Sequence, residues 1–101
     1  MENLDPLFRK KIADRLKLVL DPEVGLNIVD LGLVYDIFCE ENAVKIHVTM
    51  TTMGCPMTRY IRMSIENVLS KIPEIEQSEI EIVWSPAWSP KMINPKVMAR
   101  R

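Results

Sequence analysis

Residues 44–57 read VKIHVTMTTMGCPM, and this stretch decides the fold. Its first half alternates between apolar and polar side chains, with the apolar ones at positions 44, 46, 48 and 50. A period of two is typical of a strand with one buried face. Gly54-Cys55-Pro56 then breaks the alternation, and proline suits the first turn of a helix. The stretch therefore predicts a strand that leads directly into a helix, with Cys55 as the N-cap residue.

The helix that begins at Pro56 is expected to run to about Lys71, because Pro73 cannot continue it. Its predicted apolar side consists of Met57, Ile61, Ile65, Val68, Leu69 and Ile72. A further strand is expected over residues 79–84, with Ile80, Ile82 and Trp84 on one face. A strand that is reached through a helix pairs in parallel with the strand before it, through a right-handed crossover.

A second alternating run lies before the first, from Leu33 to Cys39. Its predicted inward face consists of Leu33, Tyr35, Ile37 and Cys39. The polar segment Glu40-Glu41-Asn42 separates the two runs, and this arrangement predicts an antiparallel hairpin.

The N-terminal part predicts one more helix. Asp5-Pro6 combines an N-cap residue with proline at the first helical position. Pro22 disfavours helical geometry at the residue before it, so the helix should stop near Leu20. Its apolar stripe consists of Phe8, Ile12, Leu16, Val19 and Leu20.

The predicted order is helix, strand, strand, helix, strand, which indicates an α+β fold with helices packed on a small mixed three-stranded sheet. The 101 residues suffice for a single domain over 1–101. Within it, residues 85–101 are expected to form an irregular tail rich in proline and tryptophan, because closely spaced prolines exclude regular elements.

The composition excludes several classes of function. The 13 basic and 14 acidic residues give a net charge of -1, which disfavours nucleic acid as a partner. The N-terminal residues lack the pattern of a signal peptide, and the apolar runs are too short to cross a membrane. Two cysteines do not form a disulfide framework. We therefore expect a cytoplasmic protein with free thiols.

Cys55 is the candidate for chemistry. The first N–H groups of a helix and the helix dipole stabilise negative charge at this position, so the thiol should have a lowered pKa. Such a thiol suits a nucleophile, a redox group or a metal ligand. The alternative is a small apolar residue in a strand-to-helix turn. Cys39 falls on the predicted strand and is interpreted as core.

Three acidic residues, Asp21, Glu23 and Asp30, lie in the long loop before the hairpin. If that loop approaches the Cys55 turn, carboxylates and thiolate together could bind a metal. The competing interpretation is that the carboxylates cap local turns. Trp88 is expected to dock, either on the protein's own surface or on a partner.

Four segments together resemble a known family. They are DPE at 21–23, NIVDLGLVY at 27–35, TMTTMGCPM at 49–57 and WSPAWSP at 84–90. Their order and spacing are similar to the SufT/PaaD-like iron–sulfur (metal–sulfur) cluster assembly domain.

The resemblance implies a non-enzymatic factor that helps to deliver iron, sulfur or clusters to client proteins. Its functional residues would be Cys55, with Glu23 and Asp30 as the acidic positions and Thr51 as the hydroxyl. The implied cargo is iron or a transiently held iron–sulfur cluster. The implied partners are client apoproteins and a separate P-loop ATPase. Trp88, in the proline-rich tail, is the candidate residue for contact with a partner. A homodimer would bring two Cys55 thiols together.

Two departures from the family pattern affect these expectations. Ser85-Pro86-Ala87 stands where the family usually has two prolines before the tryptophan. No cysteine-rich extension follows, which disfavours the alternative role as an accessory subunit of a ring-hydroxylating or epoxidising oxygenase complex. A thiol redox or sulfur-transfer protein that uses Cys55 is the other alternative.

Overall fold

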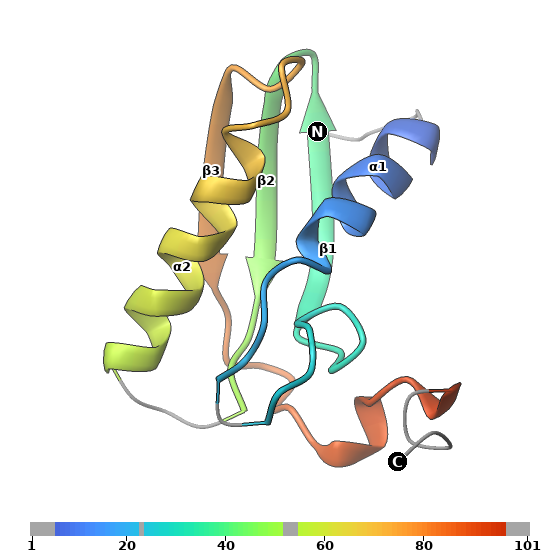
Figure 1. Ribbon diagram of the computed structural model, residues 1–101, viewed down its shortest axis with the longest axis vertical. Coiled ribbons are helices and arrows are strands. Elements are labelled where there is room, and N and C mark those ends of the chain that lie inside the picture. Colours follow the sequence, from blue (N-terminus) through green and yellow to red (C-terminus); the bar gives the residue numbers. More distant parts are fainter. Residues whose placement is uncertain (1–5, 23, 52–54, 97–101) are drawn as a thin grey trace.

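The computed structural model describes residues 6–22, 24–51 and 55–96, and the side chains of residues 55–57 lie outside this description. The elements are α1 (Pro6–Leu16), β1 (Val34–Glu40), β2 (Ala43–Val48), α2 (Cys55–Leu69), β3 (Gln77–Ile82) and the short 3-10 helix η1 (Pro90–Met92). Both α-helices lie on the same face of the sheet (Figure 1). The predicted α+β class and element order are confirmed.

The three strands form one sheet in the order β1-β2-β3. β1 and β2 pair antiparallel, and Glu41 turns the chain between them with a φ of 55°. β2 and β3 pair in parallel, as expected for strands joined through α2. Ile37, Ile46 and Ile80 are register partners across the sheet, so an apolar row crosses its centre.

The core lies between the sheet and the two helices. Its members come from every α-helix and strand, from the loop before β1 and from the segments that follow β2 and α2. They are Ile12, Leu16, Val19, Ile28, Leu31, Leu33, Cys39, Val44, Ile46, Val48, Met50, Ile61, Ile65, Leu69, Ile72 and Ile80. The alternation predicted for residues 44–50 is confirmed, because all four of its apolar positions are buried. Burial of these side chains is the main favourable term in folding.

α1 ends earlier than predicted. The residues after Leu16 continue in tight turns, in which Val19 N–H donates to the Leu16 carbonyl at 3.0 Å. The chain then pairs with the loop ahead of it, through an antiparallel bridge between Leu20 and Asn27. These bonds occupy the backbone groups that a longer helix would need, and the Leu20 side chain is left 50% exposed. The prediction that Leu20 belongs to the apolar stripe was wrong.

The two outer strands also differ from expectation in detail. The register of β1 shifts between Val34 and Asp36, so Val34 rather than Tyr35 lies opposite Val48. Such a bulge places one extra residue in the strand and ends strict alternation. β3 ends at Ile82, and Trp84 lies beyond it with 44% of its surface exposed.

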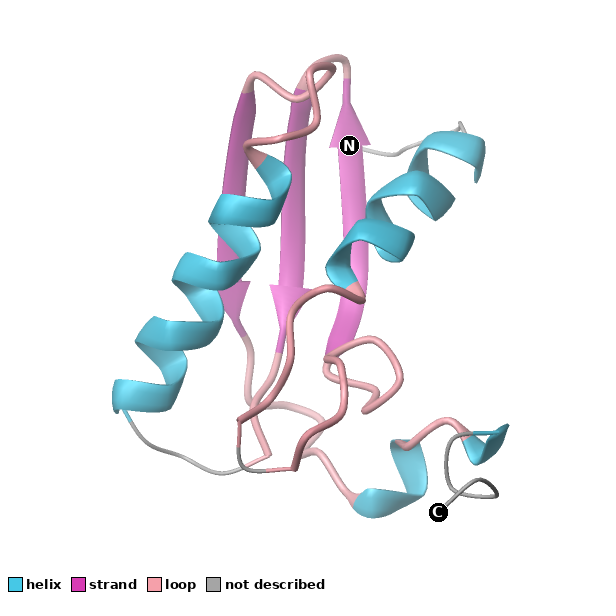
Figure 2. Cartoon of the chain, viewed as in Figure 1, coloured by secondary structure: helices cyan, strands magenta, loops and turns pink. Residues whose placement is uncertain are grey.

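The tail leaves the end of β3 and runs below the loop that precedes β1 (Figure 2), and side-chain hydrogen bonds attach it to that loop and to β1. The Trp88 indole N–H donates to the Leu31 carbonyl at 2.7 Å, and Tyr35 Oη donates to the Pro86 carbonyl at 2.7 Å. The proline spacing predicted no regular element here, yet η1 forms. A single 3-10 turn accepts Pro90 at its start, because proline lacks only an N–H that such a turn leaves unused.

None of the helices in the described part of the chain is long and apolar enough to cross a membrane.

Candidate functional site

Cys55 is the first residue of α2, one position further into the helix than predicted. The start of α2 lies at the lower end of the molecule, where β2 and β3 also end (Figure 1). The first N–H groups of this 15-residue helix have no carbonyl partner within it. Negative charge is therefore favoured at this end of α2. The Cys55 thiol itself and Gly54 lie outside the described residues.

Thr51 precedes this helix start, and its hydroxyl donates to Asp21 Oδ2 at 3.4 Å. Asp21 is 2% exposed, although it is a carboxylate. Its other carboxylate oxygen accepts from Val24 N–H at 3.3 Å, so Asp21 also caps its own turn. Its backbone N–H donates to the Leu26 carbonyl at 2.9 Å, and its own carbonyl accepts from Gly25 N–H at 2.7 Å. Asp21 thus caps its own turn and also bonds Thr51, four residues before Cys55. Its role as a metal ligand stays a prediction.

We expect Asp21 and Thr51 to be energetically coupled. In a double-mutant cycle with Asp21→Ala and Thr51→Val, the coupling free energy from urea unfolding should be about 1 kcal/mol, because the bond has a charged acceptor but is long. The control cycle pairs Thr51→Val with Asp30→Asn, because the Asp30 carboxylate bonds Asn27 and Asn94, and it should give additive effects. Additive effects in the Asp21 cycle as well would show that this bond does not hold the two segments together.

Asp30 anchors the tail. Its carboxylate accepts from the side-chain amide of Asn27 at 2.8 Å and from that of Asn94 at 3.3 Å. Its backbone carbonyl accepts from Asn94 N–H at 2.7 Å, and its own N–H donates to Asn27 Oδ1 at 2.8 Å. Both carboxylate oxygens therefore already serve as acceptors from amides. These bonds support the turn-capping interpretation of Asp30 more than the interpretation as a metal ligand.

The other two predicted site residues are Glu23 and Trp88. Glu23 lies outside the described residues. Trp88 is half-buried against the core and bonds Leu31, so its ring lies on the protein's own surface. Its role toward a partner stays a prediction.

Sequence reasoning missed how the acidic loop is held. Asp21 carried the same turn signal as Asp30, and nothing in its spacing distinguished the one that reaches Thr51. Asn94 gave no signal at all, because its contact with Asp30 spans 64 residues. Only burial of a charged residue would have identified Asp21, and burial is visible only in the folded chain.

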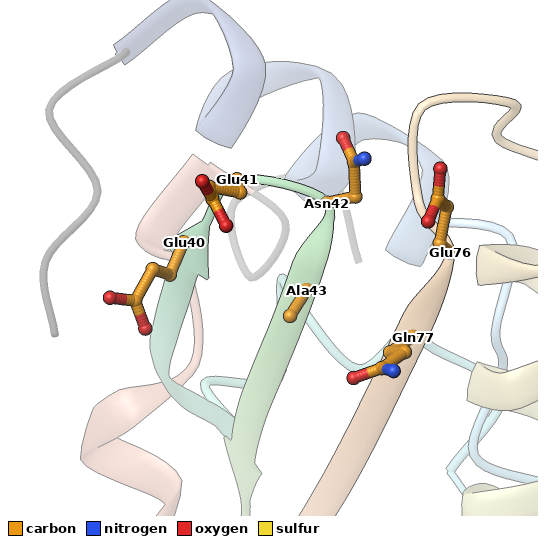
Figure 3. Close-up of a pocket in the computed structure, with 6 residues that line it drawn as sticks. All are labelled: Glu40, Glu41, Asn42, Ala43, Glu76 and Gln77. Atoms are coloured by element: carbon orange, nitrogen blue, oxygen red, sulfur yellow. The ribbon is translucent and has the colours of Figure 1, made fainter.

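A pocket of about 320 Å³ lies at the hairpin end of the sheet. Glu40, Glu41 and Glu76 surround it together with Asn42, and their carboxylates point in different directions (Figure 3). This end of the sheet is opposite the start of α2 (Figure 1). Among the described residues, no group of three or more His, Cys, Asp or Glu is arranged to hold a metal ion.

The sheet face opposite the helices carries a charged network. Lys45 lies 3.2 Å from Glu81, and His47 has Asp36 and Glu81 carboxylate oxygens at 3.7 Å from its two ring nitrogens. The Phe38 ring meets the His47 ring edge to face at 5.0 Å. His47 therefore lies among these side chains, and its buried Nε2 has no hydrogen-bond partner among the described residues.

Residues 9–82 match the family described as iron–sulfur cluster assembly protein. The chain is 45% identical over 78 residues to the Fe-S protein maturation auxiliary factor SufT of Staphylococcus aureus, covering 76% of this chain and 89% of that one. It is 38% identical over 87 residues to the Fe-S protein maturation auxiliary factor YitW of Bacillus subtilis, covering 85% of each.

A solved structure has the same fold. The crystal structure of a domain of unknown function, DUF59, from Bacillus anthracis superposes with a TM-score of 0.86 at 38% identity, covering 93% of this chain and 91% of that one. The family match spans β1, β2, β3, α2 and most of α1, and includes the Thr51–Cys55 segment. This chain belongs to the iron–sulfur cluster assembly protein family.

Proposed function

We propose that this protein is a non-enzymatic maturation factor that helps to deliver iron, sulfur or clusters to client iron–sulfur proteins, with the Cys55 thiolate as the ligand that binds iron or a cluster. The observation that carries the proposal is the position of Cys55 as the first residue of α2, within the segment of the chain that matches the family. The names of the two bacterial relatives support the general role.

In this proposal Cys55 takes part in ligand exchange at iron. A thiolate donates an electron pair to iron, and the bond passes to a client thiolate without a change of oxidation state. The helix start favours the anionic form of the sulfur over the protonated one. One thiolate is a weak site by itself, and this suits a step in which cargo must leave again.

Asp21 and Thr51 have a supporting role in this proposal. Their contact ties the segment before Cys55 to the 21–26 turn, which the core residue Ile28 follows. Holding that segment in place limits where the thiol can lie, and a restrained ligand loses less freedom when it binds. The carboxylate of Asp21 is buried against its own turn and serves as an anchor.

The second cysteine of the chain provides a matched control. Cys39 is 3% exposed and packs in the core on β1. Cells that lack this protein would be complemented with the wild type, Cys55→Ser or Cys39→Ala, and the iron content and activity of a [4Fe–4S] client enzyme would be measured. We expect Cys55→Ser to lose the complementation and Cys39→Ala to retain it. Full complementation by Cys55→Ser at equal protein levels would disprove the role of the thiol.

A purified-protein measurement separates the carrier from a thiol enzyme. The alkylation rate of Cys55 against pH gives the thiol pKa, and anaerobic titration with ferrous iron gives binding. The proposal requires iron binding that Cys55→Ser removes. A reactive thiol without iron binding would favour the sulfur-transfer alternative.

A further inference from the structure

A groove of about 480 Å³ lies between the first half of α2 and the end of β3. It is lined by Thr58, Arg59, Arg62, Ile82 and Trp84. Its walls combine two cationic side chains with an aromatic ring and an aliphatic side chain.

The strand on this side is a sheet edge. β3 is the last strand in the order β1-β2-β3. Val83 N–H donates to the Val48 carbonyl at 2.9 Å, and alternate residues of a parallel strand direct their backbone groups to the same side. Ile80 and Ile82 therefore direct theirs away from β2. Arg62 already uses this edge, because its Nη1 donates to the Ile80 carbonyl at 3.2 Å.

The two guanidinium groups have donors to spare. Each guanidinium has five N–H donors, and Arg62 spends one on Ile80. Within the described part of the chain, neither Arg59 nor Arg62 forms a salt bridge with a carboxylate. The groove is thus locally basic on a chain whose net charge is -1. Arginine pairs with carboxylates in a two-pronged geometry that lysine does not match.

We infer that this groove docks an extended, acidic segment of the client protein, with its carboxylates on Arg59 and Arg62 and its apolar side chains against Ile82 and Trp84. Charge complementarity selects this occupant, since the groove offers two arginines that form no salt bridge within the described residues, beside the outer edge of β3. Tryptophan and arginine are also the residue types that contribute most to binding at interfaces. Extended segments add to exposed strand edges in many complexes.

The groove begins close to Cys55, the proposed cargo site. The inference rests on the proposed function, because the groove would hold the client beside that residue. Thr58 follows Cys55 by three residues, which is less than one helical turn of about 5.4 Å rise. A segment that lies in the groove is therefore tethered within a short distance of the helix start. Tethering raises the effective concentration of the client thiols near Cys55.

The test uses a short fluorescein-labelled peptide in which aspartate and glutamate alternate with leucine and valine, and its lysine counterpart. Fluorescence anisotropy would be measured with the full chain. We expect the acidic peptide to bind at low salt and the lysine peptide not to bind. The double variant Arg59→Glu/Arg62→Glu should weaken binding at least about tenfold, as should Trp84→Ala. Arg9→Glu on α1, which makes the same charge change as Arg59→Glu alone, should leave the Kd within about twofold.

The variants keep the inference separate from the proposed function. Arg59→Glu alone spares the Arg62 bond to Ile80, so it tests the charge if the double variant fails to fold. Cys55→Ser should bind the peptide as the wild type does, and Trp84→Ala should keep the wild-type alkylation rate of Cys55. Equal binding of both peptides, or no effect of any groove variant, would overturn the inference while Cys55-dependent maturation stands.

Two further measurements test whether the groove binds a second copy of this chain or a nucleic acid instead. If sedimentation shows a homodimer that Arg59→Glu dissociates, the groove holds a second copy of this chain and the inference is wrong. If a labelled single-stranded DNA displaces the acidic peptide at equal concentration, the groove recognises phosphate and the inference is equally wrong.

Discussion

Replacing Gly32 by alanine is expected to destabilise the protein by about 2–5 kcal/mol and to release the tail. Gly32 has a φ of +81°, a region that costs other residues roughly 1–2 kcal/mol. A Cβ at this position would collide with the Met92 carbonyl oxygen and lie 2.9 Å from Met92 Cβ. Forcing extra atoms into a packed contact costs a further 1–3 kcal/mol or so. Urea unfolding measures the free energy, and the trypsin cleavage rate after Lys91 measures tail release.

Gly25 is the matched control for this substitution. Its φ of +82° is almost the same, but a Cβ there would meet nothing within 4 Å. Gly25→Ala should therefore cost only the roughly 1–2 kcal/mol of backbone strain and leave cleavage after Lys91 unchanged. If the two variants behave alike in both measurements, Met92 is not docked on Gly32.

Ile46→Ala is expected to lower the free energy of unfolding by about 3–4 kcal/mol. Ile46 is 0% exposed on the central strand and lies between Ile37 and Ile80 in register. Truncation of a buried isoleucine removes apolar burial and leaves a cavity. For a chain of this length the loss corresponds to a fall in Tm of roughly 15–25 °C, measured by calorimetry.

Leu18 provides the comparison for the core substitution. It is 70% exposed after the end of α1, so Leu18→Ala should stay within about 0.5 kcal/mol of the wild type. Ile46→Val should fall between the two, at roughly 0.5–1.5 kcal/mol. A small effect of Ile46→Ala would mean that the sheet centre is not the tightly packed part of the core.

The fold followed from the sequence wherever a local rule governed it. The period of two in residues 44–50 depends only on neighbouring side chains, and all of its apolar positions are buried. The parallel pairing of β2 and β3 followed from chain connectivity through α2. Local rules failed where distant backbone competed: Leu20 left the helix because Asn27 pairs with it, and the β1 bulge displaced Tyr35.

The candidate site was less predictable, because its parts come from distant segments. Cys55 at a helix start could be inferred from Pro56 alone. The contact between Thr51 and Asp21 spans 30 residues, and the groove joins Arg62 to β3. No spacing rule connects such positions. The carboxylate of Asp30 accepts hydrogen bonds from Asn27 and Asn94, which the sequence did not indicate, and its role as a functional acid stays a prediction.

The two tryptophans lie in different surroundings, so their fluorescence can report separately on two parts of the protein. Trp88 is half-buried and donates to Leu31, whereas Trp84 is open to solvent in the groove. Indole emission shifts with polarity, so each ring reports on a different event. With Trp84→Phe the remaining fluorescence follows the tail, and with Trp88→Phe it follows the groove. Movement of the tail and the proposed binding of a client segment in the groove would therefore give separate shifts in tryptophan emission.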